Sequence, residues 1–422
     1  MQRRYVGLTA AIAALSMAAT LAGCGAGTGD EDVTLKLVAA DYGSNDANTT
    51  QKYWDTLARS FEKSHPGITV DVDVKSWKDV DREVAEMVKN GQAPDLAQIG
   101  AYADYAADDR LYKVDDLLPI PTQANFLPVL TQAGKVDRVQ YGMPFAASTR
   151  LLFYNKGLFE KAGAKPPKNW DDIRDAARKL KDDGVTYPFA LPLGAEESQA
   201  ETMMWMLAGG GGYRDPGNLS YEINSSENVA TFTWLRNNLV APGLTGPVAP
   251  AELDRQEAFD AFVRGDVGML NGHPTLMEAA EKAGVDVGKV PLPSTNGEAR
   301  PAMGVADWMM AFKQNGHRKE IGAFLDYVYQ DKNVLAFSDQ YDILPVTTTA
   351  STAMRSDPKH KDLWPFLQEL PTSELYPVGN TSWAKVSESV KKNIGKAVAP
   401  DADPDTVLSA IARDADDAEA AE

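Results

Sequence analysis

Paired acidic residues are the first groups in this sequence whose chemistry could amount to a reaction. Glu196 precedes Glu197 directly, and Asp41 lies close to Asp46. Two carboxyl groups about 5 to 10 Å apart are what the hydrolysis of a glycosidic bond requires. The chain contains 60 acidic residues, so such neighbours also arise by chance. A secreted glycan-acting enzyme is therefore one alternative that the sequence leaves open.

Other catalytic and metal-binding motifs are absent from the sequence. It contains no nucleophile elbow, no His-Glu-x-x-His and no Walker sequence. Its four histidines are scattered and lack the spacing of metal ligands. The glycine run at 209–212 is not followed by the Lys-Ser/Thr of a phosphate-binding loop. We therefore expect a protein that is not an enzyme and that holds neither a cofactor nor a metal.

The N-terminal residues have the pattern of an export signal. Arg3 and Arg4 precede an apolar stretch that ends in small residues. The segment Leu21-Ala22-Gly23-Cys24 resembles the lipobox of bacterial lipoproteins, in which the cysteine is acylated, and Cys24 is the only cysteine. We expect residues 1–23 to be removed and 24–32 to form a lipidated tether at the extracytoplasmic face of the cell membrane. Both the general secretory and the twin-arginine routes remain open.

Length and charge limit the classes of function. At about 150 residues per domain, 422 residues allow two or three domains. A formal net charge of −18 repels phosphate backbones and anionic lipid head groups, so a nucleic-acid partner has no electrostatic support. Beyond the export signal, no stretch reaches the ~20 apolar residues that a membrane helix needs, so any transport role requires separate membrane subunits.

Strand and helix patterns alternate along the rest of the chain. Strands are predicted at 33–40, 68–74, 95–99, 267–270 and 303–312, a long extended segment at 141–155, and helices at 49–64, 79–90, 259–263, 320–329, from Asn169 onward and at the acidic C-terminus. This alternation predicts an α/β architecture with mainly parallel sheets. Its length fits two lobes.

Three stretches together resemble a known family. They are Tyr141-Gly-Met-Pro-Phe followed by Leu151-Leu-Phe-Tyr-Asn-Lys-Gly-Leu-Phe-Glu-Lys-Ala-Gly, the segment Ala258-Phe-Asp-Ala-Phe-Val-Arg-Gly-Asp-Val-Gly-Met-Leu-Asn-Gly272, and residues 304–329 leading to Ile343-Leu-Pro345. They are similar to segments of the maltose-binding-like extracellular solute-binding family, the carbohydrate-binding proteins of ABC importers. The resemblance covers essentially the whole chain.

The resemblance implies a two-lobe fold of the periplasmic-binding-protein type, with crossing hinge strands and a ligand cleft between the lobes. Lobe 1 would comprise 33–146 and 304–345, and lobe 2 would comprise 147–303 and 346–422. The implied partners are a carbohydrate ligand and the permease subunits of an ABC importer. We expect a monomer that binds sugar, closes on it and performs no catalysis.

Sugar clefts combine aromatic plates with polar side chains at the rim, and this chemistry selects the candidate residues. Placed by the resemblance, they are Asp41, Tyr42, Trp77, Tyr102, Ser148, Arg150, Glu197, Trp205, Asn271, His273, Asp307, Trp308 and Trp383. Asp307 and Trp308 alternate along one strand, so at most one of them points into the cleft. His273 stands where many family members have a tryptophan. Trp54, Trp170 and Trp234 are expected to pack in the core.

Three alternatives to a sugar importer remain at this point. The same fold can hold a polyol, a phosphate ester or another non-sugar ligand. A glycan-acting enzyme would release products from oligosaccharides, which a binding protein would not do. An adhesin or a sensor component would bind without contributing to uptake.

Overall fold

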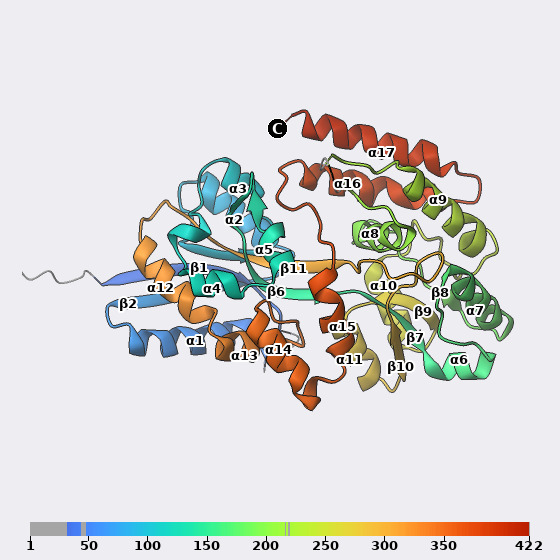
Figure 1. Ribbon diagram of the computed structural model, residues 1–422, viewed down its shortest axis with the longest axis horizontal. Coiled ribbons are helices and arrows are strands. Elements are labelled where there is room, and N and C mark those ends of the chain that lie inside the picture. The colour runs from blue at the N-terminus through green and yellow to red at the C-terminus, as the bar shows by residue number, and fades with distance from the viewer. Residues whose placement is uncertain (1–31, 44–47, 216, 218–219, 422) are drawn as a thin grey trace, which may run out of the picture.

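The computed structural model describes residues 32–43, 48–215, 217 and 220–421 of the chain. It consists of two α/β lobes lying side by side, with β6 and β11 extending from one toward the other (Figure 1). Cys24 and the residues before it lie outside the described part of the chain.

Lobe 1 is built on a five-stranded sheet in the order β2-β1-β3-β11-β6. The strands are β1 (Val33–Ala40), β2 (Ile68–Lys75), β3 (Leu96–Ile99), β6 (Met143–Thr149) and β11 (Gly304–Ala311), beside a small hairpin of β4 (Lys135–Val136) and β5 (Val139–Gln140). The helices of this part are α1 (Thr50–Ser64), α2 (Val80–Lys89), α3 (Ala103–Ala107), α4 (Ile120–Asn125), α5 (Pro128–Ala133), α12 (Arg318–Val328) and α13 (Asp331–Tyr341).

Lobe 2 is built on a four-stranded sheet in the order β10-β7-β9-β8. The strands are β7 (Leu151–Asn155), β8 (Tyr187–Phe189), β9 (Val267–Gly272) and β10 (Val287–Val290). Its helices are α6 (Lys156–Ala162), α7 (Trp170–Asp182), α8 (Ser198–Gly209), α9 (Ser226–Leu235), α10 (Arg255–Val263), α11 (Pro274–Lys282), α16 (Trp383–Asn393) and α17 (Pro404–Glu419). Helices α14 (Thr348–Ser356) and α15 (Trp364–Glu369) lie where the chain passes from lobe 1 back to lobe 2.

The expectation of mainly parallel sheets is wrong. Strands β1, β2 and β3 pair in parallel, as do β8 and β9. However, β11 pairs antiparallel with both β3 and β6, and β7 pairs antiparallel with both β9 and β10. The antiparallel pairs arise because β6, β7 and β11 lead the chain across the junction between the lobes rather than through a helical crossover within one sheet.

Local sequence signals account for the main helix ends. Asn169 caps α7, because its Oδ1 accepts a hydrogen bond from the Asp172 N–H (2.9 Å), and Asn155 caps α6 in the same way. Gly210, with φ +91°, ends α8 in the left-handed conformation that glycine adopts without strain. The predicted start of a helix at Asn169 is therefore confirmed.

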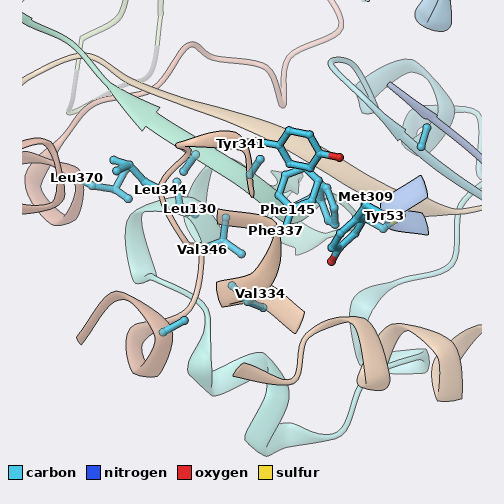
Figure 2. Packing of buried hydrophobic residues seen from close by; sticks show 14 of the residues in the cluster. Tyr53, Leu130, Phe145, Met309, Val334, Phe337, Tyr341, Leu344, Val346 and Leu370 are labelled. Atoms are coloured by element: carbon cyan, nitrogen blue, oxygen red, sulfur yellow. The ribbon is translucent and has the colours of Figure 1, made fainter. Parts of the chain in front are cut away.

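An aromatic cluster in the core of lobe 1 fixes α1 and α13 against the sheet (Figure 2). Phe337 of α13 lies 4.6 Å from Phe145 of β6, 5.0 Å from Tyr53 of α1 and 4.7 Å from Tyr341, measured between ring centroids. Aromatic pairs of this kind each add about 1 kcal/mol beyond the burial of area. Trp54 and Trp170 are buried, as predicted. None of the helices in the described residues is long and apolar enough to cross a membrane.

Candidate functional site

The first group of polar residues lies on or just after three strands that are neighbours in the sheet of lobe 1. Tyr42 follows β1, Gln98 lies on β3 and Asp307 on β11. The Tyr42 hydroxyl donates a hydrogen bond to Asp307 Oδ2 (2.7 Å) and accepts one from Gln98 Nε2 (2.9 Å). Burial raises the pKa of Asp307 to about 6, although the hydrogen bond from Tyr42 lowers it. The fold thus joins two predicted residues that are 265 positions apart.

Trp308 points away from Asp307, into a hydrophobic cluster of lobe 1. Its fully buried ring packs edge-to-face with that of Tyr102, with centroids 5.3 Å apart. The Tyr102 hydroxyl donates a hydrogen bond to the carbonyl of Ala133. In this conformation Trp308 and Tyr102 support the sheet and offer no surface to a ligand.

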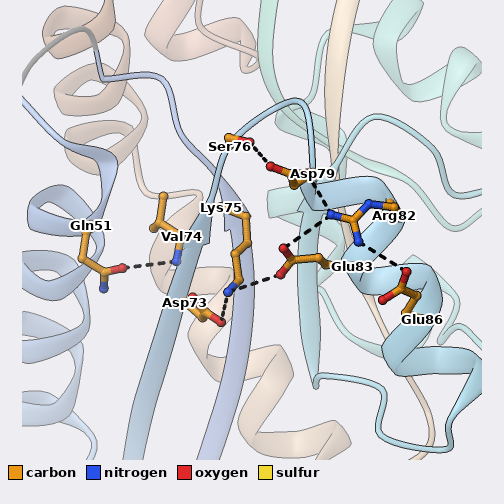
Figure 3. Close-up of polar contacts among 9 residues, drawn as sticks. All are labelled: Gln51, Asp73, Val74, Lys75, Ser76, Asp79, Arg82, Glu83 and Glu86. Carbon is orange, nitrogen blue, oxygen red and sulfur yellow. Dashed lines mark hydrogen bonds and ion pairs between the residues drawn. The ribbon is translucent and has the colours of Figure 1, made fainter.

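Trp77 forms the aromatic edge of the group around Tyr42. It is 37% exposed, and its ring meets that of Tyr42 edge-to-face at 5.4 Å. Figure 3 shows how the turn that carries it is held. Ser76 donates a hydrogen bond to Asp79 (2.8 Å), and Lys75 forms ion pairs with Asp73 and Glu83. An exposed ring on a braced turn is suited to stacking on the apolar face of a sugar.

Asp41 is occupied by backbone contacts. Its Oδ1 accepts hydrogen bonds from the N–H groups of Gly43 (2.9 Å) and Thr50 (3.2 Å), at the start of α1. Burial raises the pKa of Asp41, but these hydrogen bonds outweigh burial and lower it overall. Asp41 therefore positions Tyr42 and α1.

The second group lines a small pocket in lobe 2. It brings together residues from five places in the sequence: Arg150 between β6 and β7, Glu197 before α8, Glu201 in its first turn, Arg255 at the start of α10, and Asn271 on β9. Pro192, Ala200, Met204 and Phe259 supply its apolar surface. A small pocket with several convergent polar groups is the usual form of a small-molecule site.

Two arginines and two glutamates neutralise one another at the mouth of this pocket. Arg150 Nη2 lies 3.7 Å from Glu197 Oε1, and Arg150 Nη1 donates a hydrogen bond to Ser148 Oγ (2.8 Å). Arg255 pairs with both Glu197 and Glu196, the latter at 2.6 Å, so the predicted neighbours Glu196 and Glu197 share one guanidinium group. Arg150 is only 9% exposed.

Glu201 is the deepest acid in the pocket, with 3% exposure. Its Oε1 accepts hydrogen bonds from Trp205 Nε1 (2.8 Å) and Asn271 Nδ2 (2.9 Å). Burial raises the pKa of Glu201 to about 8, so that the carboxyl group is protonated at neutral pH. Trp205 itself is fully buried and contributes to the pocket through this hydrogen bond.

His273 lies beside the same pocket at the start of α11. Its Nδ1 is 2.7 Å from Thr275 Oγ1, and its ring meets Phe259 edge-to-face at 5.0 Å. Burial and the positive charges of Arg150 and Arg255 hold the pKa of His273 well below its usual value. The ring is therefore neutral and lies against an aromatic neighbour.

Trp383 belongs to an aromatic group beside a segment that touches both lobes. Its ring stacks on Tyr376 with centroids 5.1 Å apart. Leu375 and Val378 pack against the lobe 1 cluster around Trp308, while Tyr376 packs in lobe 2. Next to them Gly379 lies so close to the carbonyl oxygen of Lys135 that a Cβ would stand 2.1 Å from it. We call residues 374–380 the strap.

Several residues of the site were not selected from the sequence: Gln98, Glu201, Arg255, Phe259 and Tyr376. Glu201 sits in a helix that is buried all round, so its neighbours give no amphipathic signal. Asp46 lies outside the described residues. Within the described ranges no group of three or more His, Cys, Asp or Glu side chains could hold a metal ion.

Known proteins similar to this chain include proteins named for binding a sugar and for binding a phosphate ester. The family described as bacterial extracellular solute-binding protein matches residues 43–334. A binding protein of Brucella abortus (strain 2308) is 26% identical over 388 residues, which cover 90% of this chain and 92% of that protein. The maltotriose-binding protein of Pyrococcus abyssi is 25% identical over 57% of this chain and 50% of its own length. The sn-glycerol-3-phosphate-binding periplasmic protein of Brucella melitensis is 25% identical over 54% of each chain.

Solved structures show the same fold. The cyclic α-maltosyl-1,6-maltose binding protein from Arthrobacter globiformis gives a TM-score of 0.78 at 17% identity, over 92% of this chain and 100% of that chain. The acarbose-binding receptor of Streptomyces glaucescens gives 0.75 at 18% identity, over 92% and 99%. The predicted two-lobe fold of periplasmic sugar-binding proteins is confirmed.

Proposed function

We propose a function for this chain, which belongs to the family of bacterial extracellular solute-binding proteins. It binds a mono- or oligosaccharide between its lobes and delivers that sugar to an ABC importer. The observation that carries the proposal is the pocket in lobe 2, in which side chains that donate and side chains that accept hydrogen bonds converge beside apolar surface. Hydroxyl groups on a ring with apolar faces match such a mixture.

The charge balance of the pocket favours a neutral ligand. Arg150 and Arg255 are offset by Glu196 and Glu197, and Glu201 is uncharged at neutral pH. The two arginines are also the observation that supports a second candidate, a phosphate ester, which is what one relative is named for binding. An anion would have to compete with Glu197 for both guanidinium groups, so we place the sugar first.

The lobe 1 group supplies the opposite wall in this proposal. Tyr42, Trp77 and Asp307 would contact the ligand from lobe 1 (33–146 and 304–345), and Arg150, Glu197 and Asn271 from lobe 2 (147–303 and 346–422). A ligand that contacts both walls binds the closed form more tightly than the open form and so shifts the population toward closure. Closure is the signal that the permease subunits would read.

The N-terminal segment supplies the anchor in this proposal. Residues 1–23 would be removed on export, and Cys24 would carry the acyl chains that hold the monomer at the extracytoplasmic face of the membrane. Labelling cells with palmitate tests this directly, because Cys24→Ser should release an unlabelled protein. Loss of sugar uptake on deleting the gene would separate an importer component from an adhesin or a sensor.

Titration calorimetry on the chain from Gly25 onward tests the proposed function. The panel comprises mono-, di- and trisaccharides, including maltose and maltotriose, together with glycerol 3-phosphate, and each sample is also assayed for reaction products. Micromolar or tighter binding of one sugar without turnover supports the proposal and identifies the ligand. Binding of glycerol 3-phosphate alone supports the second candidate, and release of cleavage products indicates a hydrolase.

A further inference from the structure

Glu201 uses only one of its two carboxyl oxygens in hydrogen bonds among the described residues. Oε1 accepts hydrogen bonds from Trp205 and Asn271, whereas Oε2 has no hydrogen-bond partner among the described residues. The indole N–H can only donate, so Oε1 must be an acceptor oxygen. A proton on this carboxyl group therefore belongs on Oε2.

Asn271 presents the complementary atom. Its Nδ2 is committed to Glu201 Oε1, which fixes the orientation of the amide. Its Oδ1 is buried and has no hydrogen-bond partner in the described part of the chain, and the residue is only 3% exposed. An unsatisfied buried acceptor costs about 1 to 3 kcal/mol, so it is a strong indication of a missing donor. Both residues line the same pocket.

We propose that Glu201 acts as a neutral carboxylic acid whose Oε2–H and the Oδ1 of Asn271 form a donor and acceptor pair that binds one hydroxyl group of the ligand. This inference rests on the proposed function and extends it to a specificity-determining pair. A hydroxyl group can accept from Glu201 and donate to Asn271 at the same time. An ionised phosphate or carboxylate oxygen cannot donate, and would leave Asn271 Oδ1 unsatisfied.

The charged groups around Glu201 are consistent with a neutral acid. Glu197 lies one helical turn away and, as an anion, opposes a second negative charge. Arg150 and Arg255 are engaged by Glu197, and neither forms an ion pair with Glu201 within the described residues. The neutral ring of His273 supplies no compensating charge. Burial without a partner cation therefore keeps the proton on Glu201, in line with its pKa of about 8.

Difference infrared spectroscopy tests the proton without any ligand. At pH 7 the wild-type protein should show the C=O stretch of a buried protonated carboxyl group, and Glu201→Gln should lack it. Glu388→Gln is the matched control, because it removes an exposed glutamate of α16 and should keep the band. A wild-type spectrum without this band, or a band that survives in Glu201→Gln, overturns the proposal.

Binding measurements test the hydroxyl pair. For maltotriose, or whichever panel sugar the wild type binds, affinity should fall roughly tenfold between pH 7 and pH 9 as Glu201 loses its proton. Glu201→Gln keeps a hydrogen-bond donor at this position, so the affinity of this variant should stay nearly constant between pH 7 and pH 9. Deoxy analogues of the same sugar should include one whose binding is weaker by roughly ten- to a hundredfold. An equal pH dependence in both proteins overturns the proposal, and so does equal binding of every deoxy analogue. If the wild type binds no panel sugar, the proposed function fails, while the infrared comparison still decides the state of Glu201.

Discussion

Replacing Glu201 by Gln should stabilise the folded protein by an amount that grows with pH. The folded pKa of about 8 lies above the ordinary value of 4.5, so between these pH values the folded chain keeps a proton that the unfolded chain has lost. Stability therefore falls as pH rises through this window and is constant above it. Gln does not titrate, and it can still accept hydrogen bonds from Trp205 and Asn271.

The size of the effect follows from the width of the window. Each pH unit inside it changes the free energy of unfolding by about 1.4 kcal/mol. The advantage of Glu201→Gln over wild type should therefore be under about 1 kcal/mol at pH 5 and about 3 kcal/mol at pH 7. Because Glu201 is 3% exposed, solvent screening reduces this only slightly.

Urea denaturation of both proteins at pH 5, 6, 7 and 8 measures the effect. The quantity of interest is the difference between the two midpoints at each pH, since other titrating groups contribute equally to both proteins and cancel. Glu388→Gln serves again as the control, and its difference from wild type should be small at every pH. A difference for Glu201→Gln that is the same at pH 5 and pH 7 would refute the assignment of a buried, uncompensated acid.

Three further substitutions test other parts of the site. Gly379→Ala should weaken sugar binding roughly tenfold in calorimetry, because the added Cβ forces the strap away from Lys135, whereas the control Gly157→Ala on α6 should bind normally. Unchanged affinity in Gly379→Ala would show that the contact is not needed for closure. Trp77→Ala should lower affinity by about 1 kcal/mol and reduce the change in tryptophan emission on binding, and an unaltered emission change would place the ligand elsewhere. Because the pKa of Asp307 is raised to about 6, the wild-type protein should lose stability as the pH rises from about 4 to 6, and Asp307→Asn should not show this loss in the same denaturation series. A stability profile of Asp307→Asn that matches the wild type would contradict the burial of Asp307.

The strands and helices were predictable because each depends on residues close together in the chain. The helical spacing at 49–64 reflects burial on one face, which α1 preserves, whereas the alternation at 33–40 is matched by burial only at the start of β1, since residues 37–40 are all buried. Strand direction was not predictable in the same way. Alternation is identical for parallel and antiparallel neighbours, so the pattern of β11 could not reveal its antiparallel pairing with β3 and β6.

The site was predictable only where a residue type is itself informative. Tyr42 and Asp307 were selected because they follow or lie on strands, and they do meet. Trp205 was selected as an aromatic plate, but an aromatic residue in a helix that is buried all round serves packing equally well. Glu201 and Arg255 gave no signal, since neither carries a local motif and only the tertiary fold brings them to the same pocket.

Arg150 lies at a position from which its charge acts on groups of both lobes. It lies between β6, which belongs to the sheet of lobe 1, and β7, which belongs to that of lobe 2. Its backbone N–H donates a hydrogen bond to the carbonyl of Met303, the residue before β11. Its charge lowers the pKa of Asp307 in lobe 1 and of Glu201 in lobe 2, and also that of His273. A ligand that moves Glu197 away from Arg150 would therefore strengthen the attraction of Arg150 for the ionised Asp307 across the cleft, while Glu201 stays neutral. Because Arg150 is only 9% exposed, solvent screens that attraction poorly, and we expect it to favour closure of the two lobes when a ligand binds.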